Sequence, residues 1–128
     1  MFRGKLLYVW IGVILLSSMF LMGQADECQW GEPVVFPDPN LDLAVREAIS
    51  KPVGTICASD LLELTELILL SRDIEDLTGL EYCSNLTYLV SYYNQISDLT
   101  PLAGLTNLSR LGFAYAQISD LTPLAGLT

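Results

Sequence analysis

Three aspartates recur at a fixed spacing: Asp76, Asp98 and Asp120 follow one another at intervals of 22 residues. Carboxylates held side by side suggest two kinds of chemistry, glycoside hydrolysis and calcium binding. However, Asp98 and Asp120 have identical neighbours in the sequence, so nothing separates a general acid from a general base. Calcium needs six or more oxygen ligands, and no loop here supplies them. We therefore expect these aspartates to accept backbone hydrogen bonds in turns, with no catalytic residue, metal or cofactor.

The sequence contains 3 cysteines and no histidine. Without histidine, a Ser-His-Asp site, a Cys-His site and a zinc site with a histidine ligand are excluded. Three cysteines are also too few for two CxxC pairs, which excludes a zinc site built from cysteine alone. No basic cluster accompanies any of the thiols, so a catalytic cysteine is not expected. The sequence therefore favours a protein that is not an enzyme.

The cysteines are better explained by a disulfide, which would leave one thiol unpaired. Cys83 falls where later copies of a repeat have Leu105 and Leu127, so it can also serve as a small buried hydrophobe. The favoured pairing is Cys57–Cys83. The alternative is Cys28–Cys57, which would staple the segment before the fold to it.

Charge and length narrow the class of protein. The chain has 128 residues with a net charge of −9, from 15 acidic and 6 basic side chains. Because phosphate contacts need Lys and Arg, nucleic acid is excluded as a partner. The length is sufficient for one domain.

The first 25 residues differ in composition from the rest. Arg3 and Lys5 precede an apolar run over residues 6–22, and small residues follow at the two positions that a signal peptidase reads, Gly23 and Ala25. This pattern is typical of a secretory signal peptide. The alternative is an uncleaved membrane anchor, because the uncharged run is long enough to span a bilayer. Both interpretations export the chain, to the medium or to the cell surface, and only the second leaves it in contact with a membrane.

An internal repeat carries most of the information. Residues 96–106 and 118–128 both read ISDLTPLAGLT, identical at 11 positions and offset by 22. The intervening segments, residues 85–95 and 107–117, share the frame LxxLxLxxN-x-I. The first of them has Asn94 at the asparagine position, and the second has Ala116 there. A 22-residue period with this frame predicts a leucine-rich repeat.

The repeat determines the expected architecture. Each LxxLxL segment predicts a short strand whose alternate side chains point inward, and successive strands stack in parallel. The DLTPL segment turns the chain back in a 3₁₀ or irregular turn, with Pro101 and Pro123 in its first turn. We expect an α/β solenoid: a short-stranded parallel sheet on the concave face, 3₁₀ or irregular convex turns and a helical N-terminal cap. At an inward strand position, Ser91 stands between Leu69 and Phe113, and we expect Phe113 to fill the room that the serine leaves.

Terminal repeats need a cover, and residues 34–63 are typical of one. Asp38 and Pro39 predict a helix start, and the apolar spacing predicts a helix from about Pro39 to Ile49. We expect residues 34–36 to lead onto the first strand and Ser59 to cap a second, shorter helix. The predicted organisation is a signal peptide (1–25), a leading segment (26–33), the cap (34–63) and the repeats (64–128). Because the last repeat is incomplete, we expect the chain to be a fragment.

The segment FPDPNLDLAVREAI, followed by SDLLELTEL and by 22-residue repeats ending in ISDLTPLAGLTNL, resembles the internalin family of bacterial surface proteins. The resemblance covers residues 34–128. It implies a secreted or wall-attached solenoid that binds a partner on its concave face, and it does not name that partner.

The outward strand positions are the candidate binding residues. The two full copies share their convex half and differ here, and Tyr and Arg are the residue types that dominate binding hot spots. We expect a protein or glycan ligand to be recognised at this face, in a non-catalytic adhesion module. The alternatives are the targeting segment of a larger exported enzyme and a truncated, non-functional reading frame. The candidate residues are Tyr88, Val90, Tyr92, Arg110, Gly112 and Ala114.

Overall fold

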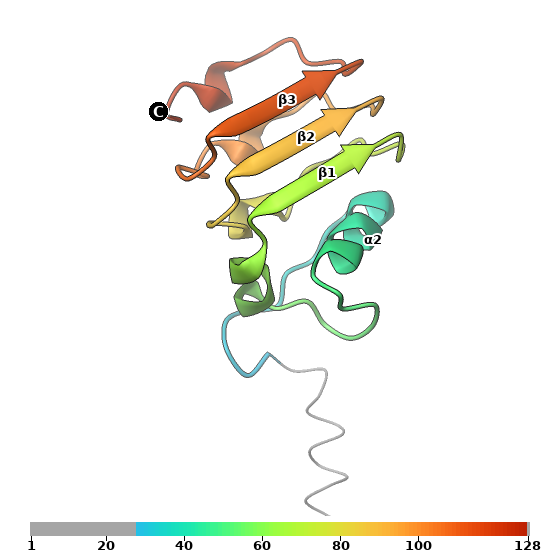
Figure 1. The fold of residues 1–128 in the computed structure, drawn as a ribbon, viewed down its shortest axis with the longest axis vertical. Coiled ribbons are helices and arrows are strands. Elements are labelled where there is room, and N and C mark those ends of the chain that lie inside the picture. The colour runs from blue at the N-terminus through green and yellow to red at the C-terminus, as the bar shows by residue number, and fades with distance from the viewer. Residues whose placement is uncertain (1–27, 128) are drawn as a thin grey trace, which may run out of the picture.

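The three strands of the structure carry the 22-residue repeat (Figure 1). The structure is a computed structural model that describes residues 28–127. Strands β1 (Glu66–Leu70), β2 (Tyr88–Tyr92) and β3 (Arg110–Ala114) form one parallel sheet in the order β1-β2-β3. The predicted parallel sheet is therefore confirmed. The predicted signal peptide lies outside the described residues, and within residues 28–127 no helix has the length and apolar character to cross a membrane.

Strict register joins the strands. Each residue pairs with the one 22 positions later, so that Leu67, Leu89 and Leu111 form one inward row. Three 3₁₀ turns return the chain on the other side of the core and contribute a second leucine row. Because apolar side chains of one repeat cover those of the next, no single repeat could bury its own leucines. The turns are η2 (Leu80–Tyr82), η3 (Thr100–Leu102) and η4 (Thr122–Leu124).

The recurring aspartates hold these turns. Asp98 Oδ1 accepts hydrogen bonds from the Thr100 backbone N–H at 2.8 Å and from the Thr100 hydroxyl at 2.6 Å. Asp76 makes the same pair of bonds to Thr78, and Asp120 accepts from the Thr122 N–H. The Thr100 bonds hold the pKa of Asp98 below its ordinary value. The carboxylates therefore close local turns, as expected from the sequence.

Polar side chains add a second set of bonds between repeats. The Asn107 side-chain amide donates to the Ser84 carbonyl at 2.8 Å, and the Ser109 hydroxyl donates to the Thr87 carbonyl at 3.1 Å. The Asn85 side-chain amide donates the equivalent hydrogen bond in the preceding repeat. Each Asn-Leu-Thr/Ser tripeptide therefore ties its repeat to the one before.

Helix α2 (Pro39–Ala48) lies beside β1 and covers that end of the core (Figure 1). Its buried residues Leu41, Ala44 and Val45 recur at the three- and four-residue spacing of a helix face. Asp38 precedes it as the N-cap, and the helix ends one residue before the predicted Ile49. The open end of the first repeat is thus closed by a helix.

Asp38 links this helix to the first repeat. Its Oδ1 accepts from the backbone N–H groups of Asn40 (2.9 Å) and Leu41 (3.2 Å). Its Oδ2 accepts from the N–H groups of Glu75 (2.7 Å) and Asp76 (3.1 Å) in the first convex turn. Burial raises the pKa of this carboxyl, but the four donors outweigh burial and bring the pKa below its ordinary value. One carboxylate therefore caps the helix and fixes its position on the repeat.

Gly79 makes a second link. Later repeats have Pro101 and Pro123 at its position, whereas Gly79 has φ of 105°. A Cβ there would lie 2.5 Å from a ring carbon of the buried Phe36. The glycine therefore lets the Phe36 ring lie directly on the first convex turn.

The segment before the helix does not follow the prediction. Residues 34–36 were expected to lead onto the first strand, but Pro33 forms an antiparallel bridge with Cys57. The Val34 N–H donates to the Ile56 carbonyl at 2.8 Å, and the Ala58 N–H donates to the Glu32 carbonyl at 2.9 Å. This segment therefore runs beside the chain that enters the first repeat.

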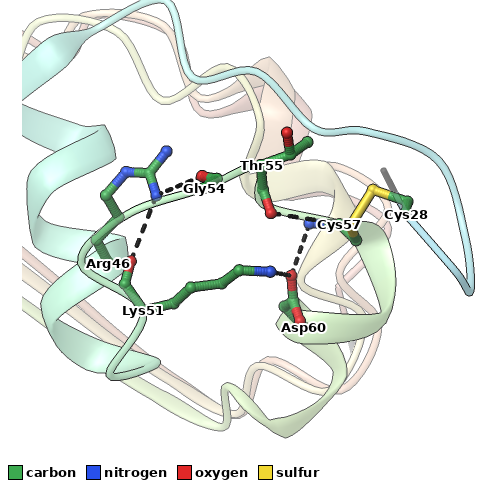
Figure 2. The surroundings of a disulfide bond; sticks show 7 residues. All are labelled: Cys28, Arg46, Lys51, Gly54, Thr55, Cys57 and Asp60. Atoms are coloured by element: carbon green, nitrogen blue, oxygen red, sulfur yellow. Dashed lines mark hydrogen bonds and ion pairs between the residues drawn. A yellow bond between two sulfur atoms is a disulfide. The ribbon is translucent and has the colours of Figure 1, made fainter. Parts of the chain in front are cut away.

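The favoured disulfide, Cys57–Cys83, was wrong. Cys28 bonds to Cys57 (Figure 2), with their Cα atoms 5.5 Å apart. Cys83 is free and buried. The antiparallel bridge brings Cys28 to Cys57, whereas Cys83 points into the core like the leucines at its position in later repeats. Burial, followed by the nearby Glu81, raises the pKa of the Cys83 thiol to about 12.

The second cap helix also differs from the prediction. It is the 3₁₀ segment η1 (Ala58–Glu63), which starts before Ser59 and has Cys57 at its N-cap. Asp60 supplies the capping contact, because its Oδ2 accepts from the Cys57 N–H at 2.8 Å and from Lys51 Nζ at 2.7 Å (Figure 2).

We predict that removing the staple, by Cys28→Ser, lowers the free energy of unfolding by about 3–4 kcal/mol, because the bond closes a loop of 29 residues. Urea denaturation with and without reductant measures the loss. Cys83→Ala is the control and should keep the full response to reductant. A response that depends on Cys83 would contradict the observed pairing.

We predict that Asp38→Ala destabilises the fold by about 2–3 kcal/mol, since a helix cap is lost and backbone N–H groups are left without acceptors. Because folding lowers the pKa of Asp38, its stabilisation is present above the ordinary carboxyl pKa and disappears as pH falls through the lower folded value. Denaturation between pH 2 and pH 7, roughly the range in which carboxyls titrate, should show a shallower acid loss in the variant. Asp42→Ala, which removes an ion pair to Arg46, is the control and should lose under about 1 kcal/mol. Equal losses for both variants would contradict the role given to Asp38.

Candidate binding surface

The outer face of the sheet collects nine side-chain positions, three from each strand. Register places Glu66, Tyr88 and Arg110 in one row at the start of the strands. Leu70, Tyr92 and Ala114 form another row at their ends. We call these positions the sheet face, and its members are Glu66, Ile68, Leu70, Tyr88, Val90, Tyr92, Arg110, Gly112 and Ala114.

The sheet face leaves large apolar side chains exposed to solvent. Ile68 and Leu70 are about half exposed, and Tyr92 is 37% exposed. Folding leaves these large side chains in solvent although the core has been completed beneath them. A contiguous group of this kind is typical of an interaction surface.

Val90 departs from the predicted exposed set, because it is only 8% exposed. Its register partner on β3 is Gly112, which has no side chain. A Cβ on Gly112 would lie 3.2 Å from the Tyr92 hydroxyl and 3.5 Å from a Val90 methyl group. The tyrosine therefore leans across the glycine, and Val90 supports the surface instead of presenting a side chain to a partner.

Two further tyrosines at the strand ends, which were outside the predicted site, extend this surface. The rings of Tyr93 and Tyr115 are stacked, with centroids 4.3 Å apart and planes inclined by 10°. They are 57% and 73% exposed. The sequence signal was an aromatic pair at the same repeat position, 22 residues apart. We call this pair the tyrosine ladder.

The backbone of the ladder is in an unusual conformation. Ser71, Tyr93 and Tyr115 each follow a strand and have φ between 50° and 58°. The turn needs this left-handed conformation, because the Ser71 and Tyr93 N–H groups continue the bonding between repeats, to the Tyr92 and Ala114 carbonyls. Left-handed backbone is unfavourable by about 1–2 kcal/mol for a residue with a Cβ. Bulky tyrosines are therefore not the residues that the turn by itself would favour.

Asn94 fixes the turn that carries Tyr93. Its Oδ1 accepts from the N–H groups of Arg72 (3.1 Å) and Ile74 (3.2 Å), one repeat earlier. Its amide donates to the Leu69 carbonyl and to the Ser91 hydroxyl, both at 2.9 Å. Ser91 is thus a buried hydrogen-bond partner for Asn94 at an inward strand position.

Three of the four basic side chains among residues 28–127 are paired within the fold. Arg46, Lys51 and Arg72 form ion pairs with Asp42, Asp60 and Glu47, at 2.7, 2.7 and 2.6 Å. Among residues 28–127, Arg110 is the basic residue without an ion-pair partner, and it is exposed on the sheet face. Its guanidinium is therefore available to a carboxylate of another molecule.

The surface provides contact area and hydrogen-bonding groups. In the part of the chain that the structure describes, no three His, Cys, Asp or Glu side chains lie close enough to hold a metal ion. Asp98 and Asp120 both serve their own turns.

Comparison with known proteins gives similarity to internalins. The internalin InlF from Listeria monocytogenes is 30% identical with a TM-score of 0.71, over 74% of this chain and 30% of that one. InlJ, also from Listeria monocytogenes and described as including a cysteine ladder, is 34% identical with a TM-score of 0.57, over 73% of this chain and 21% of that one.

A third similar structure contains the CBM51-2 and INT domains of ZmpB from Clostridium perfringens. It is 36% identical with a TM-score of 0.59, over 66% of this chain and 18% of that one. The chain thus spans less than a third of each of these three proteins. Neither a family model nor a curated protein matches the sequence.

We predict that Asn94→Ala destabilises the chain by about 2–3 kcal/mol, because buried N–H and C=O groups of two repeats lose their partner. Urea denaturation measures the change. The control is Asn107→Ala, which removes one exposed bond to the Ser84 carbonyl and should lose less than about 1 kcal/mol. If both asparagines proved equally important, the role of burial would be refuted.

Proposed function

Because the chain is an internalin-like leucine-rich repeat protein, we propose that it is an exported, non-catalytic module that binds a protein partner through its sheet face. The observation that carries the proposal is the group of large apolar side chains left exposed on that face. The partner would be extracellular, since a signal peptide or membrane anchor is expected at residues 1–25. The protein would accordingly be secreted or held at the surface of a bacterial cell.

The distribution of sequence change between repeats supports this proposal. The convex segments 96–106 and 118–128 are identical, whereas Tyr88 and Tyr92 become Arg110 and Ala114 on the sheet face. Packing between repeats restricts the inward positions of the convex half to apolar side chains. The outer face is free from that restriction, so its side chains can be suited to a partner.

Tyr92 and Arg110 are the proposed anchors. Tyr92 offers a ring that is held against Gly112 and that loses little freedom on binding. Arg110 offers planar donors that match a carboxylate. Tyr88 lies in register with Arg110 and completes this end of the surface, while Val90, Gly112 and Ala114 shape the surface beneath the larger side chains.

We predict that Tyr92→Ser and Arg110→Ala each weaken partner binding by about 2 kcal/mol, or about thirtyfold, as expected for anchors at the centre of an interface. The purified chain would be screened against an array of extracellular proteins and glycans, and binding to each hit measured by surface plasmon resonance. Trp30→Ser is the control, because Trp30 is 72% exposed and lies outside the sheet face.

Unchanged affinity in both sheet-face variants would refute the proposed site. Hits among glycans alone would refute the proposed class of partner. Equal weakening by Trp30→Ser would show that the effect does not come from the sheet face.

A further inference from the structure

The tyrosine ladder has features that the fold does not explain. Tyr93 and Tyr115 are more than half exposed, so they contribute little to the core. Both have the left-handed backbone that disfavours bulky side chains. Their mutual stacking offsets only part of the strain of two left-handed residues. Strained and exposed aromatic residues of this kind indicate a functional role.

The ladder has an open position beside Tyr93. The three equivalent residues are Ser71, Tyr93 and Tyr115, which follow β1, β2 and β3. Tyr115 covers one face of the Tyr93 ring. On the other side stands Ser71, whose short, exposed side chain is too small to cover a ring. A planar group can therefore be added to the stack above Ser71.

A carboxylate stands two residues after Ser71 in the same turn. Asp73 is exposed and has no ion pair among residues 28–127. Asn94 Oδ1 binds the N–H groups on both sides of Asp73, which places this aspartate beside the turn that carries Tyr93. Later repeats have Gln95 and Gln117 at the same position, so the carboxylate is specific to the repeat with the open position.

The nearest basic side chain does not neutralise this charge. Arg72 lies between Ser71 and Asp73 in the sequence, but its guanidinium is bonded to Glu47 of α2 at 2.6 Å. The open position therefore combines a free aromatic face with an unpaired carboxylate. This combination is complementary to a group that is both planar and positively charged.

We propose that the open position of the tyrosine ladder binds an arginine side chain of a basic partner segment. The guanidinium stacks on Tyr93 above Ser71 and pairs with the Asp73 carboxylate. Lysine offers a compact charge without a plane, so it gains the charge attraction and loses most of the stacking. This inference rests on the proposed function and adds a chemical class to the partner.

Two synthetic peptides of equal length and charge, one of alternating Gly-Arg and one of alternating Gly-Lys, test the proposal. Titration calorimetry with the purified chain should show about fivefold tighter binding of the arginine peptide, which corresponds to about 1 kcal/mol of cation–π stabilisation. Asp73→Asn should weaken both peptides, and more so the arginine peptide. Trp30→Ser, at an equally exposed aromatic residue away from the ladder, should leave the preference intact.

Two variants remove the arginine preference in opposite ways. Tyr93→Ser deletes the ring, and serine is the residue that the first repeat already has at this position. Ser71→Tyr fills the open position with a third ring. In both variants the ratio of the affinity for the arginine peptide to that for the lysine peptide should fall to about one. Both variants should keep the thermal transition of the parent chain.

Equal binding of the two peptides to the parent chain, or a preference that survives both variants, would overturn the inference. Failure of the inference is separable from failure of the proposed function. In the first case the Tyr92 and Arg110 variants still lose the partner found by array screening. In the second case those variants bind that partner as tightly as the parent chain.

Discussion

Stacking of one repeat on the next in strict register is the constraint on which the whole structure depends. Every register pair between β1, β2 and β3 joins residues of equivalent repeat position, and the leucine rows are continuous only because of that register. A slip of one residue would place the outward side chains in the core. The convex half must therefore repeat closely, and the strands must keep their inward leucines.

Polar side chains fix the register at places where leucines alone would allow sliding. Asp38 accepts hydrogen bonds from two separate segments, and Asn94 both accepts and donates hydrogen bonds across two repeats. Both side chains are buried. Their bonds are directional, so they specify position more sharply than apolar contact does. Asp38 performs this task between the helix and the first repeat, and Asn94 performs it between the first two repeats.

The same constraint explains where variation is found. Outward side chains contact no other repeat through the core, so substitutions such as Tyr88 to Arg110 leave the stacking intact. Residues just after the strands are even less restricted by packing between repeats, although the turn imposes a left-handed backbone on them. Tyrosine at these positions is unfavourable for the turn and favourable for contact with another molecule, which connects local conformation to the proposed binding.

The repeat, the parallel sheet, the turn aspartates and the helix start at Asp38 could all be predicted from the sequence, because each depends on local spacing and residue type. The outward positions followed from the two-residue period of a strand. The burial of Val90 did not, because it depends on a tyrosine leaning across a glycine of the neighbouring strand. The stacked ladder was visible only as a repeated aromatic position.

The disulfide shows the same division. The sequence established that one thiol would remain. The choice of partner for Cys57 depended on the antiparallel bridge between Pro33 and Cys57, in a segment without repeats. Periodicity determines structure where each unit packs on a copy of itself. The irregular ends of the solenoid pack on different segments, so their contacts are decided only when the chain is folded.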